Sequence, residues 1–409
     1  MKTVLLIATL DTKGREAAYI KERIEEKDTA VLVLDCGTAG LPIGPPADLT
    51  REAVAREAGR SYADVLAMSR DDAGAIMADG TARTVRRLYD ESLIDGVLGI
   101  GGSDGTILAT AGMRPLPLGF PKLVVSAMAC GNTRFGEYVG TKDVTVMPSG
   151  VDVAGVTPFT RRIFDNAVAA ICGMVSNVHS QDLGDNLIAV TMYGQTTECV
   201  THAEKQVADA GYELVAFHPN GFGGALMEEM IEENTFQAVW DLTPQELSEE
   251  IAVGLPEGVR PRLISDPPGG LPRVVSLGCL DFIWRKLDDP APLEGRLQYR
   301  FNPQITLGKL RPDEMEKVAA LMVERVNALP GQTTVLLPLG GISQWDKDGE
   351  PFREADLDEI LFTSLREGLR PPVRLLELDA HINDAAFSAA CATALIDMLA
   401  DAATGSADA

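Results

Sequence analysis

The residues with the clearest chemical potential lie in the segment IDGVLGIGGSDGTILATAGM, residues 94–113. Its apolar run Val97–Ile100 predicts a buried strand, and Ile107–Met113 predicts the helix that follows. Glycines between a strand and a helix let backbone N–H groups converge on one point, where the helix dipole also favours an anion. We therefore predict a phosphate-binding loop made of Gly101, Gly102, Ser103, Asp104, Gly105 and Thr106.

The individual side chains of this loop leave its role open. Ser103 and Thr106 can cap the helix or donate to phosphate oxygens, whereas Asp104 has the wrong charge for a phosphate unless it holds a metal ion. The loop matches neither the dinucleotide fingerprint nor the P-loop lysine motif. A tight strand-to-helix turn without a ligand is the alternative.

Further polar residues follow the other predicted strands of the N-terminal half. Because parallel strands end at one edge of a sheet, we expect these residues to lie together there. Lys13 would balance phosphate charge, while Asp11 and Asp143 would hold Mg²⁺. Taken singly, Asp11 can be a helix cap and Lys13 a surface charge. The predicted ligand-binding residues of this group are Asp11, Thr12, Lys13, Ser126, Gly131 and Thr141.

Histidines supply the candidate chemistry of the C-terminal half. The chain has 4 histidines, and both His218 and His381 follow predicted strands. They are predicted to act as a general acid and base with Asp241, or to bind a metal with Asp241 or Asp281. A hydrogen-bonded structural histidine is the alternative for each.

The elements that must position these residues alternate between strand and helix. Lys2–Thr9 is a nearly continuous apolar run, as in a parallel strand buried on both faces, and Arg15–Glu26 has helical spacing behind a cap at Asp11 or Thr12. The same alternation begins again at Leu187, after a polar stretch. We predict an α/β fold with two Rossmann-like, doubly wound domains and mainly parallel sheets, at residues 1–182 and 183–409.

Composition limits the classes of function. The chain of 409 residues is 45% hydrophobic and carries a formal net charge of −24, which disfavours nucleic acids and acidic membranes as partners. No apolar run reaches the roughly 18 residues of a membrane span, and the start lacks a signal-peptide pattern, so we expect a soluble cytoplasmic protein. Its 6 cysteines are scattered, which predicts free thiols. A small-molecule substrate is therefore expected.

Several stretches resemble the uncharacterised protein family that includes the ATP-binding N-terminal domain of a plant tobamovirus-resistance inhibitor. The resemblance implies two Rossmann-like subdomains, ATP bound by the first, and a homodimer or higher homo-oligomer. The matching stretches span almost the whole chain: Thr9–Gly14, Gly101–Thr106, Val139–Asp143, Val151–Gly155, Phe217–His218, Gly223–Gly224, Gly278–Asp281, Asn302–Gln304 and His381–Asp384.

This chain departs from the family pattern at three positions. Asp104 stands where the family loop usually has glycine, which crowds the phosphates or adds a metal ligand. Phe301 replaces a histidine that relatives commonly carry before the Asn-Pro pair, and Lys309 lies where an arginine is usual. Keeping the fold therefore does not guarantee the activity of the second site.

The leading prediction is an ATP-binding protein that uses Mg²⁺ and acts on a small metabolite in a cleft between the two domains, with His218 and His381 moving protons. A non-catalytic, nucleotide-dependent binding or regulatory module is the first alternative. A metal-dependent lyase or hydrolase of a carboxylated small molecule is the second. The sequence identifies neither the substrate, the reaction nor the metal.

Overall fold

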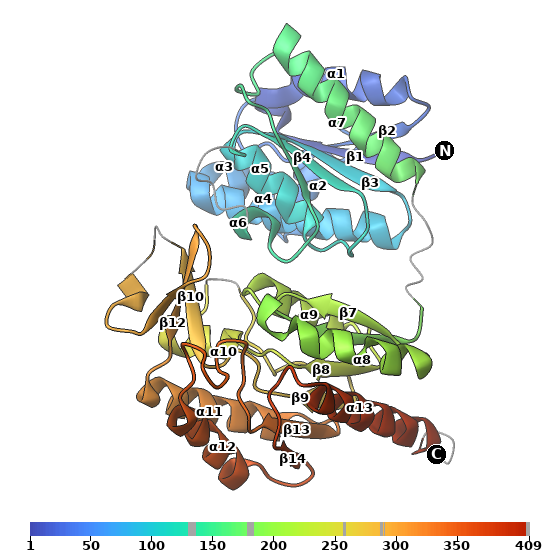
Figure 1. Ribbon diagram of the computed structural model, residues 1–409. Helices are drawn as coiled ribbons and strands as arrows, with labels where there is room; N and C mark the ends of the chain where they lie inside the picture. Colours follow the sequence, from blue (N-terminus) through green and yellow to red (C-terminus); the bar gives the residue numbers. More distant parts are fainter. Residues whose placement is uncertain (130–135, 178–183, 257–258, 287–288, 290, 406–409) are drawn as a thin grey trace. The chain divides into compact units, whose positions relative to one another are not determined.

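Strands and helices of the chain form two compact units, Met1–Asp182 and Leu183–Ala409, which we call the N-terminal and C-terminal units (Figure 1). The computed structural model describes residues 1–129, 136–177, 184–256, 259–286, 289 and 291–405. Each unit has a parallel sheet with helices on both faces. The predicted α/β fold with doubly wound, mainly parallel sheets is confirmed.

The described part of the N-terminal unit has a 5-stranded sheet in the order β2-β1-β3-β4-β5, and all neighbouring strands run parallel. The central strands are completely buried because their sequences are apolar on both faces. The strands are β1 (Thr3–Ala8), β2 (Ala30–Asp35), β3 (Gly96–Gly101), β4 (Lys122–Ser126) and β5 (Thr145–Pro148).

Two helix layers cover this sheet (Figure 1). Helices α1 and α7 pack with Val4 and Leu6 on one face, whereas α2, α3, α4 and α5 pack with Leu5 and Ile7 on the other. The helices are α1 (Leu10–Glu25), α2 (Arg51–Glu57), α3 (Tyr62–Ala67), α4 (Arg70–Asp90), α5 (Ser103–Met113), α6 (Gly136–Val139) and α7 (Pro158–Ser176).

The strand order places a topological switch point between β1 and β3. The chain leaves β1 for β2 on one side and later enters β3 on the other side. Helices α1 and α5 therefore follow neighbouring strands, β1 and β3, but pack on opposite faces of the sheet. In open α/β sheets, ligands bind in the crevice at this point, beyond the carboxyl ends of the strands.

Helix α1 starts earlier than predicted. It begins at Leu10 instead of Arg15, with Thr9 at the N-cap position and a non-helical residue at Lys13. Asp11 and Thr12 therefore belong to the first turn, and the prediction that one of them caps the helix is wrong. The early start is possible because the carboxylate of Asp35, at the end of β2, accepts from the N–H of Leu10 at 3.0 Å.

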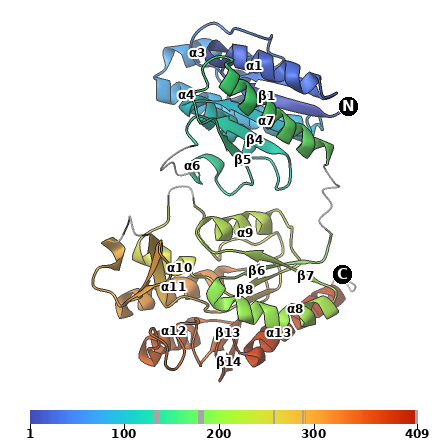
Figure 2. The same cartoon turned by 45° about the horizontal axis from the view of Figure 1, so that its top comes forward.

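The C-terminal unit repeats this architecture in its described residues, with a 6-stranded parallel sheet in the order β14-β13-β9-β8-β6-β7. Helices α8 and α13 pack on one face, and α10, α11 and α12 pack on the other. Figure 2 shows α9 on the opposite side of the sheet from α8. The strands are β6 (Leu187–Thr191), β7 (Glu213–Phe217), β8 (Ala238–Asp241), β9 (Arg273–Val275), β13 (Thr333–Pro338) and β14 (Arg374–Leu378).

The helices of this unit have the following bounds: α8 (Thr197–Asp209), α9 (Phe222–Glu232), α10 (Glu246–Ala252), α11 (Pro312–Ala328), α12 (Ala355–Gly368) and α13 (Ala385–Gly405). In addition, 3₁₀ turns lie at Gly194–Thr196 and Ala291–Leu293. Helix α13 contains a window, Ala385–Ala402, that is long and apolar enough to cross a membrane by length and composition alone. Its residues Phe387, Cys391 and Leu395 are buried in the core against the sheet, which explains its apolar character.

A small antiparallel sheet was missing from the prediction. It has the order β10-β12-β11 and consists of β10 (Phe282–Lys286), β11 (Gln298–Arg300) and β12 (Ile305–Lys309). Its strands have only 5, 3 and 5 residues, which is too short for a clear periodic pattern. Aromatic contacts hold the sheet to the unit, including Phe282 with Phe352 at 6.3 Å between ring centroids.

Two glycines of α4 test the packing of the N-terminal unit. A Cβ atom at Gly80 would lie 2.1 Å from the carbonyl oxygen of Val54 in α2, whereas one at Gly74 would meet no atom within 4 Å. We expect Gly74→Ala to stabilise the protein by up to about 1 kcal/mol, because alanine has the higher helix propensity. Gly80→Ala should destabilise it by about 1–3 kcal/mol through overpacking. Urea unfolding followed by circular dichroism measures both, and equal effects would contradict this packing.

Candidate functional site

The predicted phosphate loop lies at the switch point of the N-terminal unit. Strand β3 ends at Gly101, Gly102 is the N-cap residue, and α5 begins at Ser103. Among the described residues, no acceptor receives a hydrogen bond from the N–H groups of Ser103, Asp104 or Gly105. A Cβ atom added to Gly102 would meet no atom of the described residues within 4 Å. The start of α5 therefore offers unpaired donors beside open space.

Other helices of the same unit begin differently. Side-chain hydroxyls of Thr50, Ser61, Ser69 and Thr157 cap helices α2, α3, α4 and α7. Helices α1 and α5 have no such cap. At α1, the carboxylate of Asp35 and the carbonyl of Thr9 accept from N–H groups of the first turn instead. The absence of a cap therefore leaves donors for a ligand mainly at α5.

Two hydroxyls predicted to face the phosphate are already bonded to each other. Thr106 Oγ1 and Ser126 Oγ lie 2.7 Å apart, and both residues are buried. Ser126 Oγ also accepts from the N–H of Met128 at 3.1 Å. This pair joins α5 to the end of β4. Both hydroxyls thus have partners within the protein, and their predicted contact with a ligand stays a prediction.

Asp104 has a partner that the sequence did not reveal. Arg70, the first residue of α4, donates to Asp104 Oδ2 from Nη2 at 2.6 Å and from Nε at 3.1 Å. The hydrogen bond to Asp104 raises the pKa of Arg70. Arg70 and Asp104 are 80% and 47% exposed, so the pair can exchange partners at little cost. The pair neutralises the charge of Asp104 and brings a guanidinium group to the phosphate loop.

The start of α1 supplies the remaining predicted residues at this edge. Asp11 Oδ2 accepts from the N–H of Ala39 at 3.0 Å, while Asp11 Oδ1 is buried without a partner among the described residues. The exposed Thr12 bonds the hydroxyl of Thr9 at 2.8 Å. Lys13 donates from Nζ to the carbonyl of Val153, which holds its charge near the carboxyl edge of the sheet.

Asp143 lies elsewhere, so the predicted Asp11–Asp143 metal site is wrong. Its carboxylate contacts Lys122 Nζ at 2.7 Å and the N–H of Gly119 at 2.9 Å. Lys122 begins β4, which places Asp143 at the amino edge of the sheet, opposite the phosphate loop. Burial lowers the pKa of Lys122, and Asp143 opposes that shift. The sequence argument failed because Asp143 precedes β5 instead of following a strand.

The last ligand-binding candidates of this unit lie apart from the loop or outside the described part. Thr141 lies in the turn between α6 and β5, on the segment that leads to Asp143. Gly131 lies outside the described residues. Among the residues described, no group of three or more His, Cys, Asp or Glu side chains is arranged to hold a metal ion.

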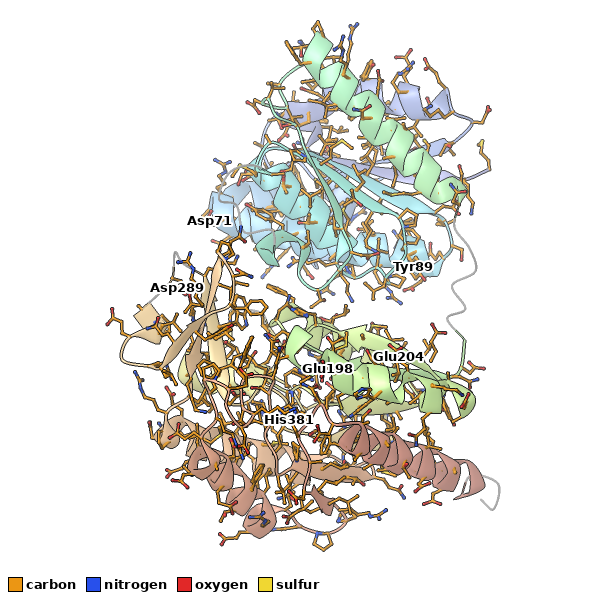
Figure 3. The ribbon with its side chains drawn as sticks, viewed as in Figure 1. Asp71, Tyr89, Glu198, Glu204, Asp289 and His381 are labelled. Carbon is orange, nitrogen blue, oxygen red and sulfur yellow. The ribbon has the colours of Figure 1, made fainter. Side chains whose placement is uncertain are left out.

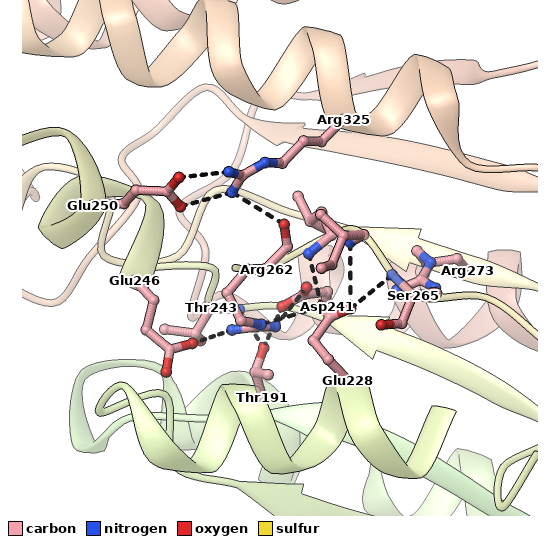
Figure 4. A network of polar contacts seen from close by, with 12 residues as sticks. Thr191, Glu228, Asp241, Thr243, Glu246, Glu250, Arg262, Ser265, Arg273 and Arg325 are labelled. Carbon is pink, nitrogen blue, oxygen red and sulfur yellow. Dashed lines mark hydrogen bonds and ion pairs between the residues drawn. The ribbon is translucent and has the colours of Figure 1, made fainter. Parts of the chain in front are cut away.

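Asp241 ends β8 and belongs to a buried charge network centred on Arg262, which we call the Arg262 network (Figure 4). Arg262 Nη2 donates to Asp241 Oδ2 at 2.7 Å, and Arg262 also pairs with Glu246 and Glu228. Burial opposes the charge of Arg262, but the carboxylates raise its pKa. Thr191 donates to the other oxygen of Asp241 at 2.8 Å. With both oxygens occupied and no exposure, Asp241 is structural.

The two candidate histidines have different surroundings. His381 is 5% exposed; its Nε2 lies 2.9 Å from the carbonyl oxygen of Ser343, and its Nδ1 accepts from the N–H of Asn383 at 3.2 Å. Figure 3 shows His381 inside the C-terminal unit. His218 is exposed and packs edge-on against Tyr193 at 4.7 Å between ring centroids. Both ring nitrogens of His381 contact backbone groups, as expected of the structural alternative. No hydrogen bond joins His218, His381 and Asp241 within the described residues, and their joint catalytic role stays a prediction.

The glycine-rich loop after His218 illustrates a closed helix start. Asn220 Oδ1 accepts from the N–H groups of Phe222 and Gly223 at 3.3 and 3.1 Å. Glu246 accepts from the N–H of Gly221 at 2.6 Å. Carboxylate and amide oxygens of the protein thus accept hydrogen bonds from the N–H groups at the start of α9 that an anion would need. The start of α5 is open, whereas the start of α9 is filled.

Sequence reasoning missed Arg70 and Arg262, which meet their partners only through the fold. It also missed a buried group of carboxyls, Asp281, Asp346 and Asp358, although Asp281 was considered as a metal ligand. Arg70 follows the capping residue Ser69, and that local pattern indicated only a helix start.

Comparison with known sequences shows to which protein family the chain belongs. Residues 2–180 match the N-terminal domain, and residues 185–399 the C-terminal domain, of the uncharacterised protein family UPF0261. The chain belongs to the UPF0261 family. A UPF0261 protein of Clostridium tetani is 34% identical over 403 residues, covering 97% of this chain and 99% of that protein.

The expected resemblance to a plant resistance protein is also confirmed. The ToMV resistance protein Tm-1 of Solanum lycopersicum is 30% identical over 423 residues, which cover 96% of this chain and 55% of the tomato protein. Among solved structures, a UDP-N-acetylglucosamine 2-epimerase from Rickettsia bellii is similar over 67% of this chain and 78% of its own, with 11% identity and a TM-score of 0.24. At that TM-score, the likeness supports no conclusion about this UPF0261 protein.

The Arg262 network predicts a large stability difference between two neighbouring arginines. Arg262→Ala leaves Asp241, Glu246 and Glu228 buried without their cation, which should cost about 3–5 kcal/mol. Arg260→Ala removes only an exposed pair with Glu232 and should cost less than about 1 kcal/mol. The chain's 3 tryptophans all lie in the C-terminal unit, so their fluorescence during urea unfolding measures both values. Similar values for the two variants would contradict a structural role for the network.

Proposed function

We propose that the N-terminal unit binds ATP, with the phosphates at the start of α5. The observation that carries this proposal is the set of unpaired N–H groups of Ser103, Asp104 and Gly105 beside the open space at Gly102. A helix N-terminus with free donors attracts anions through both hydrogen bonds and the helix dipole. The resemblance to a family with an ATP-binding domain favours ATP over other phosphate compounds.

Two cations strengthen the case for a triphosphate. Arg70 reaches the first turn of α5 through Asp104, and Lys13 lies at the same carboxyl edge of the sheet. In a protein with a formal net charge of −24, an anionic ligand needs such local positive groups. We infer that Arg70 exchanges Asp104 for a phosphate oxygen when the nucleotide binds.

Mg²⁺ enters this proposal as part of the nucleotide complex. Mg²⁺ commonly keeps several waters and takes one or two carboxylates together with substrate phosphates. Asp11 fits the role of that carboxylate, because its Oδ1 is buried without a partner among the described residues. Asp143 does not fit, since it lies at the other edge of the sheet.

A second candidate function is a non-catalytic module that responds to the nucleotide. It is favoured by the surroundings of Asp241 and His381, whose polar atoms are held by Arg262, Thr191 and backbone groups. We therefore assign binding to the N-terminal unit and no catalytic step to these residues. Measuring ATP hydrolysis by the whole chain distinguishes this module from an enzyme that consumes ATP, because a binding module leaves ATP intact.

The first test fills the open space in front of the helix start. Gly102→Val should lower ATP affinity at least about tenfold, because the new side chain occupies the phosphate position, and its Cβ atom meets no described atom within 4 Å in the free protein. Gly173→Val is the control, since Gly173 is an exposed residue of α7 that also has no atom within 4 Å of an added Cβ. Calorimetric titration with ATP and Mg²⁺ is the measurement. No heat of binding to the wild-type protein would refute the proposal.

The second test measures the separate effects of Arg70 and Asp104 on ATP affinity. Arg70→Ala should weaken ATP binding about tenfold, the value of a charge-assisted hydrogen bond, and should affect AMP less. Asp104→Asn should strengthen ATP binding several-fold, because it frees Arg70 and removes a negative charge near the phosphates. Arg83→Ala, which removes a similar exposed pair with Asp79 in α4, should have no effect. Unchanged ATP affinity in Arg70→Ala would exclude the exchange of partners.

A further inference from the structure

Three carboxyl groups lie together inside the C-terminal unit, away from the proposed nucleotide site. Asp281 lies between β9 and β10, Asp346 lies in the loop between β13 and α12, and Asp358 lies in the first turn of α12. Asp281 and Asp346 are 0% exposed, and Asp358 is 1% exposed. We call these residues the carboxyl cluster.

The carboxyl cluster fixes the loop that follows β13, residues 340–354. Ser343 in this loop donates to Asp281 Oδ2 at 2.9 Å. Asp346 Oδ2 accepts from the N–H of Ile342 at 2.8 Å. Arg353, near the end of the loop, contacts Asp358 Oδ2 at 2.5 Å and Asp346 Oδ1 at 3.3 Å. Both ends of the loop are thus tied to the cluster.

The polar partners of the cluster are incomplete. In the described part of the chain, Asp281 Oδ1 and Asp358 Oδ1 are buried and have no hydrogen-bond partner. Asp346 and Asp358 interact through their side chains. A carboxylate oxygen buried without a donor is costly, whereas a protonated carboxyl can donate to its neighbour.

Charge counting leads to the same result. Arg353 and Lys309 are the cations that face the cluster, so three ionised carboxylates would leave one negative charge uncompensated in a buried site. One bound proton removes that charge. A metal ion is a poor substitute, because no group of three acidic, His or Cys side chains among the described residues has the geometry to hold one.

The other groups around the cluster are accounted for. Cys279 lies beside Asp281, and burial raises the pKa of its thiol. The imidazole of His381 contacts the backbone of Ser343. Asp348 is 98% exposed, and Glu354, which is 56% exposed, lies 4.0 Å from Lys309. Helix α11 packs against α12 through apolar residues of the shared core. None of these groups supplies the missing positive charge.

We propose that the carboxyl cluster is a proton-operated latch, in which a proton on Asp358, facing the buried carboxylate of Asp346, keeps the loop of residues 340–354 in place. Loss of the proton leaves like charges facing each other in the interior and loosens the loop. The loop carries Trp345 and Phe352, whose rings pack at 4.4 and 6.5 Å from Tyr299 of β11. Opening the latch would therefore expose an aromatic surface of the C-terminal unit.

The direction of the pH effect follows from the two carboxyls. Burial raises the pKa of Asp281 to about 7, and Asp346 adds to that shift. Burial also raises the pKa of Asp358 to about 8, with contributions from Asp346 and Asp281. In the unfolded chain both titrate near about 3.9. Between about pH 4 and 8 the folded protein thus holds more protons than the unfolded chain: one on Asp358 up to about pH 8, and a second on Asp281 up to about pH 7. Its stability therefore falls as the pH rises through that range and levels off above it.

The test compares Asp358→Asn with Asp348→Asn in the full chain. Each bound proton makes the folding equilibrium constant fall about tenfold per pH unit. Asp358→Asn, which supplies an amide donor without a charge, should bind about one proton fewer on folding between pH 5 and 7. Asp348→Asn removes an exposed partner of the same arginine and should keep the wild-type slope. Urea unfolding at pH 5 to 9, followed by tryptophan fluorescence, gives the slopes.

A local measurement completes the test. The amide hydrogen-exchange protection of residues 340–354 should decrease above about pH 8 in the wild-type protein and stay constant in Asp358→Asn. Asp281→Asn is the second variant if Asp358→Asn does not fold, and it should also reduce the number of protons bound. An Asp358→Asn slope equal to that of the wild type, or the same loss in Asp348→Asn, would overturn the proposal.

Discussion

The parallel arrangement of the strands is the constraint on which both units depend. A parallel sheet buries both of its faces under helices. Because its strands all run in the same direction, their carboxyl ends lie at one edge, and the loops and helix starts that follow them gather there. In the N-terminal unit this edge collects the starts of α1 and α5 at the β1–β3 switch point. Helix starts bring unpaired N–H groups, and each unit must satisfy them with its own side chains or leave them for a ligand.

The two units resolve this requirement in opposite ways. In the C-terminal unit, Asn220 and Glu246 occupy the donors before and within the first turn of α9, and Arg262 neutralises the carboxylates that converge on it. In the N-terminal unit, α5 follows Gly102 without a side-chain cap, and the nearest acidic group, Asp104, is bound to Arg70. The start of α9 is thus filled by side chains of the protein, whereas the start of α5 is open. This contrast is the physical basis for placing the anion site in the N-terminal unit.

Buried charge is concentrated in the C-terminal unit, with different consequences at its two centres. Around Arg262, one guanidinium holds three carboxylates. Glu228 and Glu246 also accept from backbone N–H groups, and Asp241 accepts from the hydroxyl of Thr191, so the network is fixed. In the carboxyl cluster, two oxygens lack a donor among the described residues, and a proton substitutes for the missing partner. Removing one partner of a buried ion pair destabilises a protein by more than the intact pair stabilises it. The first centre therefore acts as a structural clamp, and the second is sensitive to pH.

Most of the fold was predictable because apolar strands and amphipathic helices are local patterns. The runs at Lys122–Ser126, Glu213–Phe217 and Thr333–Pro338 predicted strands with the observed bounds. The antiparallel strands β10, β11 and β12 escaped prediction because they have only three to five residues each, and their pairing is decided by contacts with aromatic residues distant in sequence. The glycine-rich turn between β3 and α5 was also predictable, since a glycine-rich turn between a strand and a helix is a local signal.

The sequence by itself determined the α/β class and the position of the open helix start. Only the tertiary structure decided which charged groups meet: Arg70 with Asp104, Asp143 with Lys122, and Arg262 with Asp241. The spacing of residues along a chain fixes the period of a helix or strand, whereas the partner of a side chain depends on how distant segments pack. A carboxylate that looks like a metal ligand in the sequence is therefore a structural anion once a cation from another element lies beside it.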